Sequence, residues 1–175
     1  MEIVPLIGAD AIRARIAELA AQLARDYAHA PLTLVCILEG ARRFADALCA
    51  ELAARRLAPE RVDVRARRTQ GMRLEPVQIE GFQPERLAGR DVLVLDDIAD
   101  EGATLRAVLD VAALGEPRSL RSAVLVDKRE RRLAGLAPDY AGFSVDSGWV
   151  VGFGMDLDGA HRELDYIGVI RDARF

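Results

Sequence analysis

Four carboxylates stand close together in the middle of the chain, directly after an apolar stretch. The apolar residues are Val92–Leu95, and the carboxylates that follow are Asp96, Asp97, Asp100 and Glu101. Gly102 and Thr104 come next and open a segment with helical periodicity. Carboxylates can bind sugar hydroxyls or a metal ion, and the free N–H groups at a helix N-terminus bind phosphate. The segment therefore predicts a site for a phosphorylated sugar.

The order of these residues suits such a site. Asp96 and Asp97 are consecutive, so their side chains diverge at the end of a strand. One carboxylate can accept hydrogen bonds from the two hydroxyls of a diol while the other reaches a metal or the backbone. Gly102 permits the positive φ that an anion-binding turn often needs. The alternative is a solvated acidic turn that caps a helix. Each acidic residue there contributes only about 0.3–1 kcal/mol, which accounts poorly for four carboxylates that repel one another.

Apolar strands and amphipathic helices alternate around this segment. Buried strands are expected at Leu32–Leu38, around Val62 and Val64, at Val92–Leu95 and at Leu120–Val126. Helical stripes are formed by Ile12, Ile16, Leu19 and Leu23 after a cap at Asp10, by Phe44, Leu48 and Leu52 after a turn at Gly40, and by Leu105, Val108, Leu109 and Ala112 within Thr104–Leu114. The alternation predicts right-handed crossovers and a parallel sheet flanked by helices.

Two regions depart from that pattern. Arg65–Pro84 is a basic, glycine-containing segment with a short hairpin expected near Val77–Ile79. The last third predicts short strands, at Tyr140–Val145, Trp149–Phe153 and Tyr166–Ile170, that form a flap over one sheet edge. Ligands of open parallel sheets bind beyond the carboxyl ends of the strands. The candidate loops are therefore residues 38–40, residues 96–104 and the segment after Val126.

Composition narrows the class of protein. The 175 residues are 51% apolar, enough for one domain with a core, and the formal net charge of −4 argues against nucleic acid as the main partner. No apolar run reaches the roughly 18 residues of a membrane span, and no secretion signal is expected. Cys36 and Cys49 are expected to be reduced thiols of a cytoplasmic protein. Neither a P-loop nor an early G-x-G-x-x-G motif is present, and His29 and His161 are too far apart for a histidine zinc site.

The acidic segment resembles a known family. Leu95–Leu105 is similar to the phosphoribosyl-pyrophosphate loop of the type I phosphoribosyltransferases. Four segments further along the chain resemble the hypoxanthine-guanine branch: Leu125–Arg129, Pro138–Phe143, Trp149–Asp156 and His161–Leu164. The resemblance runs in order from about residue 34 to residue 170. It implies a purine salvage enzyme in which a 6-oxopurine displaces pyrophosphate from phosphoribosyl pyrophosphate, with Mg²⁺ bound to the pyrophosphate.

The resemblance also assigns roles to the acidic segment. Asp96 and Asp97 would hold the ribose hydroxyls, directly or through the metal. The 5′-phosphate would lie against Asp100, Glu101, Gly102, Ala103 and Thr104. Asp100 would accept the proton from purine N7, or equally stabilise positive charge on the ribose. The implied metal ligands are Asp96, Asp97 and Asp156.

Further residues are assigned to the purine and to pyrophosphate. Lys128 would donate to the purine O6, Trp149 would stack on the base, and Val150 and Asp156 would meet its other edge. Without the resemblance, Lys128 reads equally well as a surface lysine and Trp149 as a core aromatic. Pyrophosphate would bind Leu38, Glu39, Gly40 and Arg162. Residues 65–80 would form a mobile lid that excludes water.

Three positions depart from the family pattern. Glu39 stands where lysine is common, although the backbone there, often in a cis peptide, makes much of the pyrophosphate contact. Glu101 replaces a common threonine beside the phosphate. Two unit charges about 4 Å apart cost roughly 4 kcal/mol at an effective dielectric of 20, so Glu101 must point away or meet an arginine or a metal. The predicted lid carries Arg67-Arg68-Thr69 in place of a Ser-Tyr pair.

The resulting prediction is a type I phosphoribosyltransferase-like α/β domain over residues 1–175. Its core spans about 30–145, and residues 146–175 with the N-terminal residues form a small hood over the carboxyl edge of the sheet. A homodimer or homotetramer is implied by the resemblance alone. Two alternatives stay open: a nucleotide-sensing regulator on the same fold, and a xanthine-preferring phosphoribosyltransferase.

Overall fold

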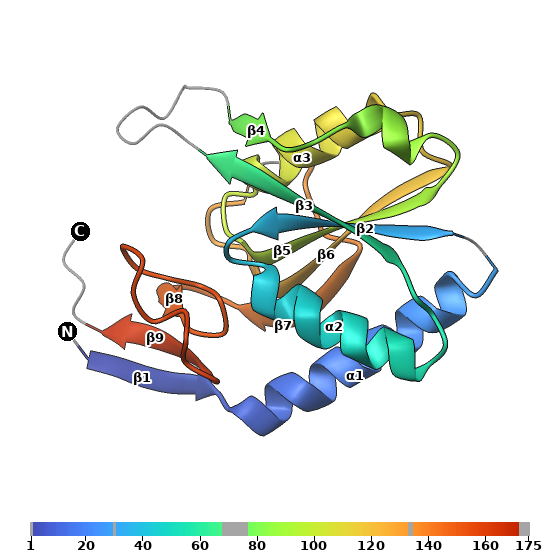
Figure 1. Cartoon of the computed structure of the whole chain (residues 1–175). Coiled ribbons are helices and arrows are strands. Elements are labelled where there is room, and N and C mark those ends of the chain that lie inside the picture. The colour runs from blue at the N-terminus through green and yellow to red at the C-terminus, as the bar shows by residue number, and fades with distance from the viewer. Residues whose placement is uncertain (1, 30, 68–76, 133–134, 172–175) are drawn as a thin grey trace.

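The computed structural model describes residues 2–29, 31–67, 77–132 and 135–171. Its main feature is a six-stranded sheet in the order β4-β3-β2-β5-β6-β7 (Figure 1). The strands are β2 (Leu32–Leu38), β3 (Glu60–Arg67), β4 (Gln78–Glu80), β5 (Asp91–Ala99), β6 (Ser119–Lys128) and β7 (Tyr140–Val145). All neighbours pair in parallel except β3 and β4. The predicted α/β class with a parallel sheet is confirmed.

Helices cover both faces of this sheet. Helices α1 (Ala9–Asp26) and α2 (Arg42–Ala54) pack on one face, while α3 (Ala103–Ala113) and the short 3₁₀ helix η1 (Pro84–Leu87) pack on the other. Alternate strand residues enter the two cores: Leu34 and Leu93 face α1 and α2, whereas Val35 and Val94 face α3. The central strands are therefore continuous apolar runs, because they are buried on both sides.

A second, three-stranded antiparallel sheet lies at the carboxyl edge of the main sheet, next to β7 (Figure 1). It contains β1 (Glu2–Ile7), β9 (Ile167–Arg171) and β8 (Trp149–Val151), in the order β1-β9-β8. We call this sheet, with the residues that connect β8 to β9, the hood. The hood brings the first strand of the chain beside the last one, which a reading of local sequence periodicity does not disclose.

Several predicted boundaries were wrong. Helix α1 is capped by Gly8, and Asp10 lies inside its first turn, where the carboxylate pairs with Arg13 instead of with a backbone N–H. Strand β5 continues to Ala99, because β6 runs alongside it and supplies partners up to Asp127. Asp96 and Asp97 thus belong to the strand, not to the loop after it. Strand β8 ends at Val151, since Gly152 turns with φ +97°.

The predicted lid, residues 65–80, is described only at its two ends. Arg65 and Arg67 are in β3 and pair with Glu80 and Gln78 of β4, so the predicted hairpin strand near residues 77–79 is confirmed. Residues 68–76, including Arg68 and Thr69, lie outside the described residues. Among the described helices, none is both long and apolar enough to cross a membrane.

Candidate active site

Two adjacent cavities lie at the carboxyl edge of the main sheet. The larger, about 410 Å³, is lined by Asp96, Asp97, Ile98, Asp100, Glu101, Gly102, Ala103, Thr104, Leu105, Arg131 and Trp149. The smaller, about 240 Å³, is lined by Asp97, Ile98, Asp100, Lys128, Gly148, Trp149, Val150, Met155 and Asp156. They share Asp97, Ile98, Asp100 and Trp149. The predicted phosphate-binding and purine-binding residues therefore line neighbouring spaces, with Asp100 at the boundary.

Asp96 and Asp97 form a buried carboxylate pair at the end of β5. Their exposed fractions are 7% and 9%. Burial, followed by the charge of Asp97, raises the pKa of Asp96 well above its usual range, and burial also raises the pKa of Asp97. The Ile98 N–H donates to Asp97 Oδ1 at 2.8 Å, and the guanidinium of Arg162 opposes the rise in the pKa of Asp97. A solvated acidic turn is thus excluded for this pair, because both residues are buried at the end of a strand.

The side chains of Asp100 and Lys128 meet at the carboxyl ends of the neighbouring strands β5 and β6. The Lys128 Nζ donates to Asp100 Oδ2 at 3.0 Å, although the two residues are 28 positions apart in sequence. The Lys128 side chain is only 6% exposed, so it is not a surface lysine. Asp100 Oδ1 is buried and has no hydrogen-bond partner among the described residues. A buried acceptor without a donor is costly, and Asp100 is a residue that lines both cavities.

The turn before α3 has the geometry of an anion site. Gly102 adopts φ +83°, and a Cβ there would stand 2.1 Å from Leu136 Cδ2, so both the backbone angle and the packing demand glycine. Helix α3 begins at Ala103, and the N–H groups of its first turn point toward the larger cavity. Glu101 and Arg131 line that same cavity, which brings a cation near the unusual glutamate.

Trp149 forms one wall of the smaller cavity. It lies at the start of β8, in the hood, and is 41% exposed, which is incompatible with a core role. Its Nε1–H donates to the backbone oxygen of Asp156 at 3.4 Å. Val150 is buried beside it. An exposed ring held at its edge above a cavity is suited to stacking on a flat ligand.

The loop after β2 touches the buried carboxylate pair. The Leu38–Glu39 peptide bond is cis, as the family resemblance implied. A Cβ at Gly40 would stand 2.0 Å from Asp97 Oδ2, so only glycine lets the loop approach this closely. The Glu39 side chain is 46% exposed and pairs with Arg42 at 2.9 Å and Arg65 at 3.8 Å. The backbone thus faces the site while the glutamate points toward two arginines.

Arg162 comes from the hood and lies next to this loop. Its Nη1 donates to the Gly154 oxygen at 2.6 Å, and its Nη2 pairs with Asp156 Oδ1 at 2.7 Å. Gly154 packs on Gly40, because a Cβ at Gly154 would stand 2.2 Å from the Gly40 oxygen. The other Asp156 oxygen accepts from the Gly159 N–H at 2.6 Å. Asp156 is therefore already engaged through both oxygens.

A metal ion would need oxygens from a ligand as well as from the protein. Among the described residues, no group of three or more His, Cys, Asp or Glu side chains converges on one point. Mg²⁺ commonly binds one or two carboxylates together with substrate oxygens. The Asp96–Asp97 pair fits this mode, because burial raises the pKa of both carboxyls, and a divalent cation would stabilise their charged forms. Asp156 fits it less well, since Arg162 occupies its carboxylate.

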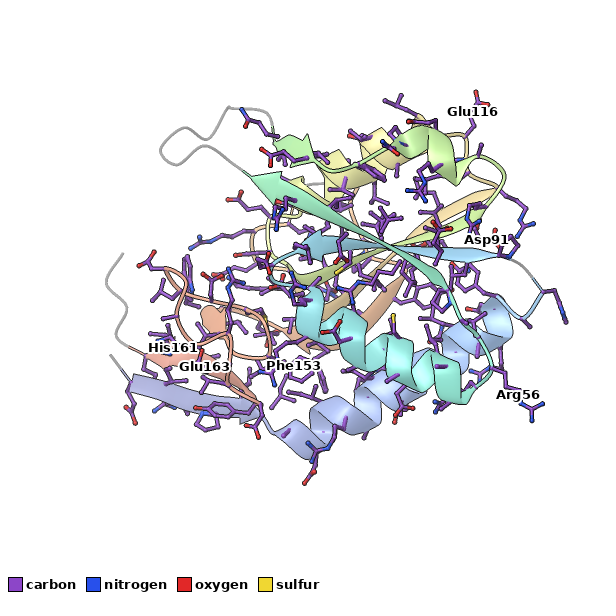
Figure 2. The ribbon with its side chains drawn as sticks, in the orientation of Figure 1. Arg56, Asp91, Glu116, Phe153, His161 and Glu163 are labelled. Atoms are coloured by element: carbon purple, nitrogen blue, oxygen red, sulfur yellow. The ribbon has the colours of Figure 1, made fainter. Side chains whose placement is uncertain are left out.

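Sequence reasoning missed several residues of the site. Ile98, Gly148, Met155 and Arg131 line the cavities. Phe153 of the hood is labelled in Figure 2. Arg43 donates from Nη1 to the oxygens of Arg162 and Leu164 at 3.0 and 2.5 Å, and its guanidinium lies 4.8 Å from the centre of the Phe153 ring. It thereby fastens the hood to α2. Nothing in the local sequence distinguishes it from the neighbouring Arg42.

A further cavity of about 410 Å³ lies between β1, β7 and β9. It is lined mainly by apolar side chains such as Leu6, Phe143 and Val169, and shares no residue with the other two. It contains neither a carboxylate pair nor a lysine. The chemistry is therefore assigned to the two cavities that meet at Asp100.

Comparison with known proteins agrees with this geometry. Residues 8–158 match the family model of the phosphoribosyl transferase domain. The chain belongs to the phosphoribosyl transferase family. It is 35% identical over 164 residues to the hypoxanthine phosphoribosyltransferase of Salmonella typhimurium, covering 91% of this chain and 90% of that protein. It is 30% identical to the hypoxanthine-guanine phosphoribosyltransferase of Bacillus subtilis, with coverage of 96% and 93%.

Solved structures extend the agreement to the whole fold. The hypoxanthine phosphoribosyltransferase of Trypanosoma cruzi in complex with the product IMP superposes with a TM-score of 0.91 at 29% identity, covering 99% of this chain and 96% of that one. The type I phosphoribosyltransferase fold predicted from the sequence is thus confirmed.

Proposed function

We propose that this protein is a purine salvage transferase. It moves the 5-phosphoribosyl group from phosphoribosyl pyrophosphate to hypoxanthine or guanine, giving IMP or GMP and pyrophosphate. The observation that carries the proposal is the position of Asp100, which stands between the two cavities with one oxygen on Lys128 and the other without a donor. The hypoxanthine and hypoxanthine-guanine phosphoribosyltransferases among its relatives support the choice of substrate.

The proposed reaction makes one bond and breaks another at the ribose C1. A ring nitrogen of the purine forms the new C1–N bond, the C1–O bond to pyrophosphate breaks, and the N7 proton passes to Asp100 Oδ1. The carboxylate also stabilises the positive charge that develops on the ribose. Lys128 donates to the purine O6, which favours 6-oxopurines over adenine. Its ion pair with Asp100 in the free protein holds both side chains beside the cavity that receives the base.

The remaining contacts position the two substrates. Trp149 stacks on the base, while Val150 and Asp156 meet its other edge. The turn from Glu101 to Thr104 holds the 5′-phosphate. The backbone of residues 38–40 and the guanidinium of Arg162 hold pyrophosphate. In this scheme the Glu39 side chain makes no substrate contact, which accords with its pairing to Arg42 and Arg65.

Mg²⁺ belongs to the proposal as a partner of the donor substrate. Asp96 and Asp97 are the residues that would hold it, together with ribose hydroxyls and pyrophosphate oxygens. The ion supplies charge neutralisation at the leaving pyrophosphate. We further propose a cytoplasmic location, supported by two free cysteines, and a homodimer or homotetramer, which sedimentation of the purified protein tests.

A substrate panel tests the function. Purified protein with phosphoribosyl pyrophosphate and Mg²⁺ is offered hypoxanthine, guanine, xanthine, adenine and uracil. The expected result is turnover of hypoxanthine or guanine, no turnover of adenine or uracil, and a loss of activity when Mg²⁺ is chelated. Dominant use of xanthine would show that the protein is a phosphoribosyltransferase whose preferred base is xanthine. No turnover of any base, with nucleotide binding intact, would instead favour the nucleotide-sensing regulator.

The role of Asp100 has its own variant. Asp100→Asn removes the proton acceptor but keeps the shape of the side chain. We expect kcat to fall by about 10²–10⁴-fold while substrate dissociation constants change little. An unchanged kcat would remove Asp100 from the chemical step. Lys128→Ala should instead weaken purine binding and reduce the preference against adenine.

A further inference from the structure

Arg132 makes an unusual number of contacts for a residue that lines neither cavity at Asp100. Its side chain is 12% exposed. Its Nε donates to the Asp100 oxygen at 3.0 Å and its Nη1 to the Leu136 oxygen at 3.3 Å. Its Nη2, which carries two hydrogens, lies within hydrogen-bond distance of the Ala99 oxygen at 2.5 Å, the Lys128 oxygen at 2.9 Å and the carboxylate of Asp127. Four of these five residues lie at the carboxyl ends of β5 and β6, which carry Asp100 and Lys128; the exception is Leu136. One guanidinium thus joins the carboxyl end of β5 to that of β6.

The position of Arg132 is itself fixed. Asp127 is 4% exposed and holds Arg132 on one oxygen, while Arg129 pairs with its other oxygen at 3.0 Å. Asp127 is also the register partner of Ala99, so the anchor stands beside the strand end that Arg132 binds. A buried guanidinium needs a carboxylate and acceptors for its N–H groups, and here both are present.

The aliphatic stem of Arg132 reaches a third functional element. A Cβ placed on Gly102 would stand 3.4 Å from Arg132 Cδ and 2.1 Å from Leu136 Cδ2. Arg132 therefore packs directly beneath the turn proposed to hold the 5′-phosphate. The same side chain therefore contacts the chain at Asp100, at Lys128 and at Gly102.

We infer that Arg132 is a positioning residue that sets Asp100 relative to Lys128 and to the phosphate turn. This rests on the proposed function. Arg132 does not line the two cavities, so its effect must pass through the backbone oxygens that it binds. A planar guanidinium presents five N–H donors in a fixed fork, whereas lysine offers one compact ammonium. Lysine at this position keeps the charge for Asp127 but cannot bridge both strand ends.

Two variants, Arg132→Lys and Asp127→Asn, test the inference, and Arg129→Met is the matched control. Arg129 pairs with the same carboxylate but is 75% exposed, and within the described part of the chain its side chain has no hydrogen bond to the backbone of the site. We expect Arg132→Lys to lower kcat by about 10–100-fold, because small misplacements of reacting groups are costly, with KM for phosphoribosyl pyrophosphate changing less than threefold. Arg129→Met should retain kcat within twofold. Thermal unfolding of each variant is recorded in parallel.

The proposed function and the role of Arg132 are tested by different measurements. Wild-type turnover tests the proposed function, and the ratio of variant to wild-type kcat tests the inference. A folded Arg132→Lys with kcat within threefold of wild type would overturn it, since a purely structural role lowers the melting temperature and leaves the folded enzyme's kcat intact. If Arg132→Lys does not fold, Asp127→Asn, which weakens the anchor and keeps an acceptor, decides. A fall in its kcat of fivefold or more supports the inference, and a smaller change refutes it.

Discussion

The buried carboxylate pair lowers the stability of the ligand-free protein, so we predict that removing one of its charges raises stability and lowers activity. Asp96 and Asp97 are 7% and 9% exposed, and the pKa of each is raised, most strongly that of Asp96. We expect Asp96→Asn to stabilise the ligand-free protein at neutral pH. Asparagine is close in shape to the protonated acid, and its oxygen can still accept from the Asp97 N–H, which lies 3.0 Å from Asp96 Oδ1.

The magnitude follows from the charges. Two unit charges about 4 Å apart repel by roughly 4 kcal/mol at an effective dielectric of 20. Proton uptake by the pair relieves part of this, so we expect a gain of about 1–3 kcal/mol. For a chain of this size each kcal/mol moves Tm by about 2–4 °C, which places the rise at roughly 2–12 °C.

The sign of the pH dependence is fixed by the raised pKa. Between the ordinary carboxyl value of 3.8 and the higher folded value, the folded state binds more protons than the unfolded state. Stability of the wild-type protein therefore falls as pH rises through that window. The Asp96→Asn variant lacks this loss, so its advantage in Tm should be absent near pH 4 and should grow toward neutral pH.

The assay is thermal unfolding of both proteins across pH, without Mg²⁺ or substrate, paired with turnover at neutral pH. Activity of the variant should fall, because the ribose and the metal lose a carboxylate. A variant that is less stable than wild type at neutral pH would refute the reasoning. So would a difference in Tm that does not change with pH.

Three further outcomes are expected from single features. Gly40→Ala places a Cβ 2.0 Å from Asp97 Oδ2 and should lower kcat/KM by about 10²-fold or more in steady-state assays. The control is Gly8→Ala, where a Cβ meets nothing within 4 Å. Equal activities of the two variants would contradict this prediction. Gly102→Ala combines φ +83° with a contact 2.1 Å from Leu136 Cδ2 and should weaken binding of a nucleoside monophosphate in calorimetry. Burial raises the pKa of Cys36 to about 12, so a thiol reagent at pH 8 should label it in the denatured protein and not in the native one.

Local sequence was sufficient for much of the fold. The strand at Leu32–Leu38 was predicted with its observed bounds, because an unbroken apolar run is typical of a strand buried on both faces. The positive φ of Gly102 was also predicted from its place before a helix. The cap at Asp10 was wrong because a side chain's choice between backbone and Arg13 is not encoded in spacing. The end of β5 was misplaced because a strand ends where its neighbour stops supplying partners.

The sequence by itself determined the family and the order of the acidic residues, since both depend on residues adjacent in the chain. Only the tertiary structure decided how those residues act together. It brings Lys128 to 3.0 Å from Asp100, seats Gly40 against Asp97 and places Arg132 under the whole site. These contacts join segments far apart in sequence, and the parallel pairing of β5 with β2 and with β6, not any local pattern, sets their distances. The raised pKa values of the carboxylate pair have the same origin, because burial is a property of the folded chain.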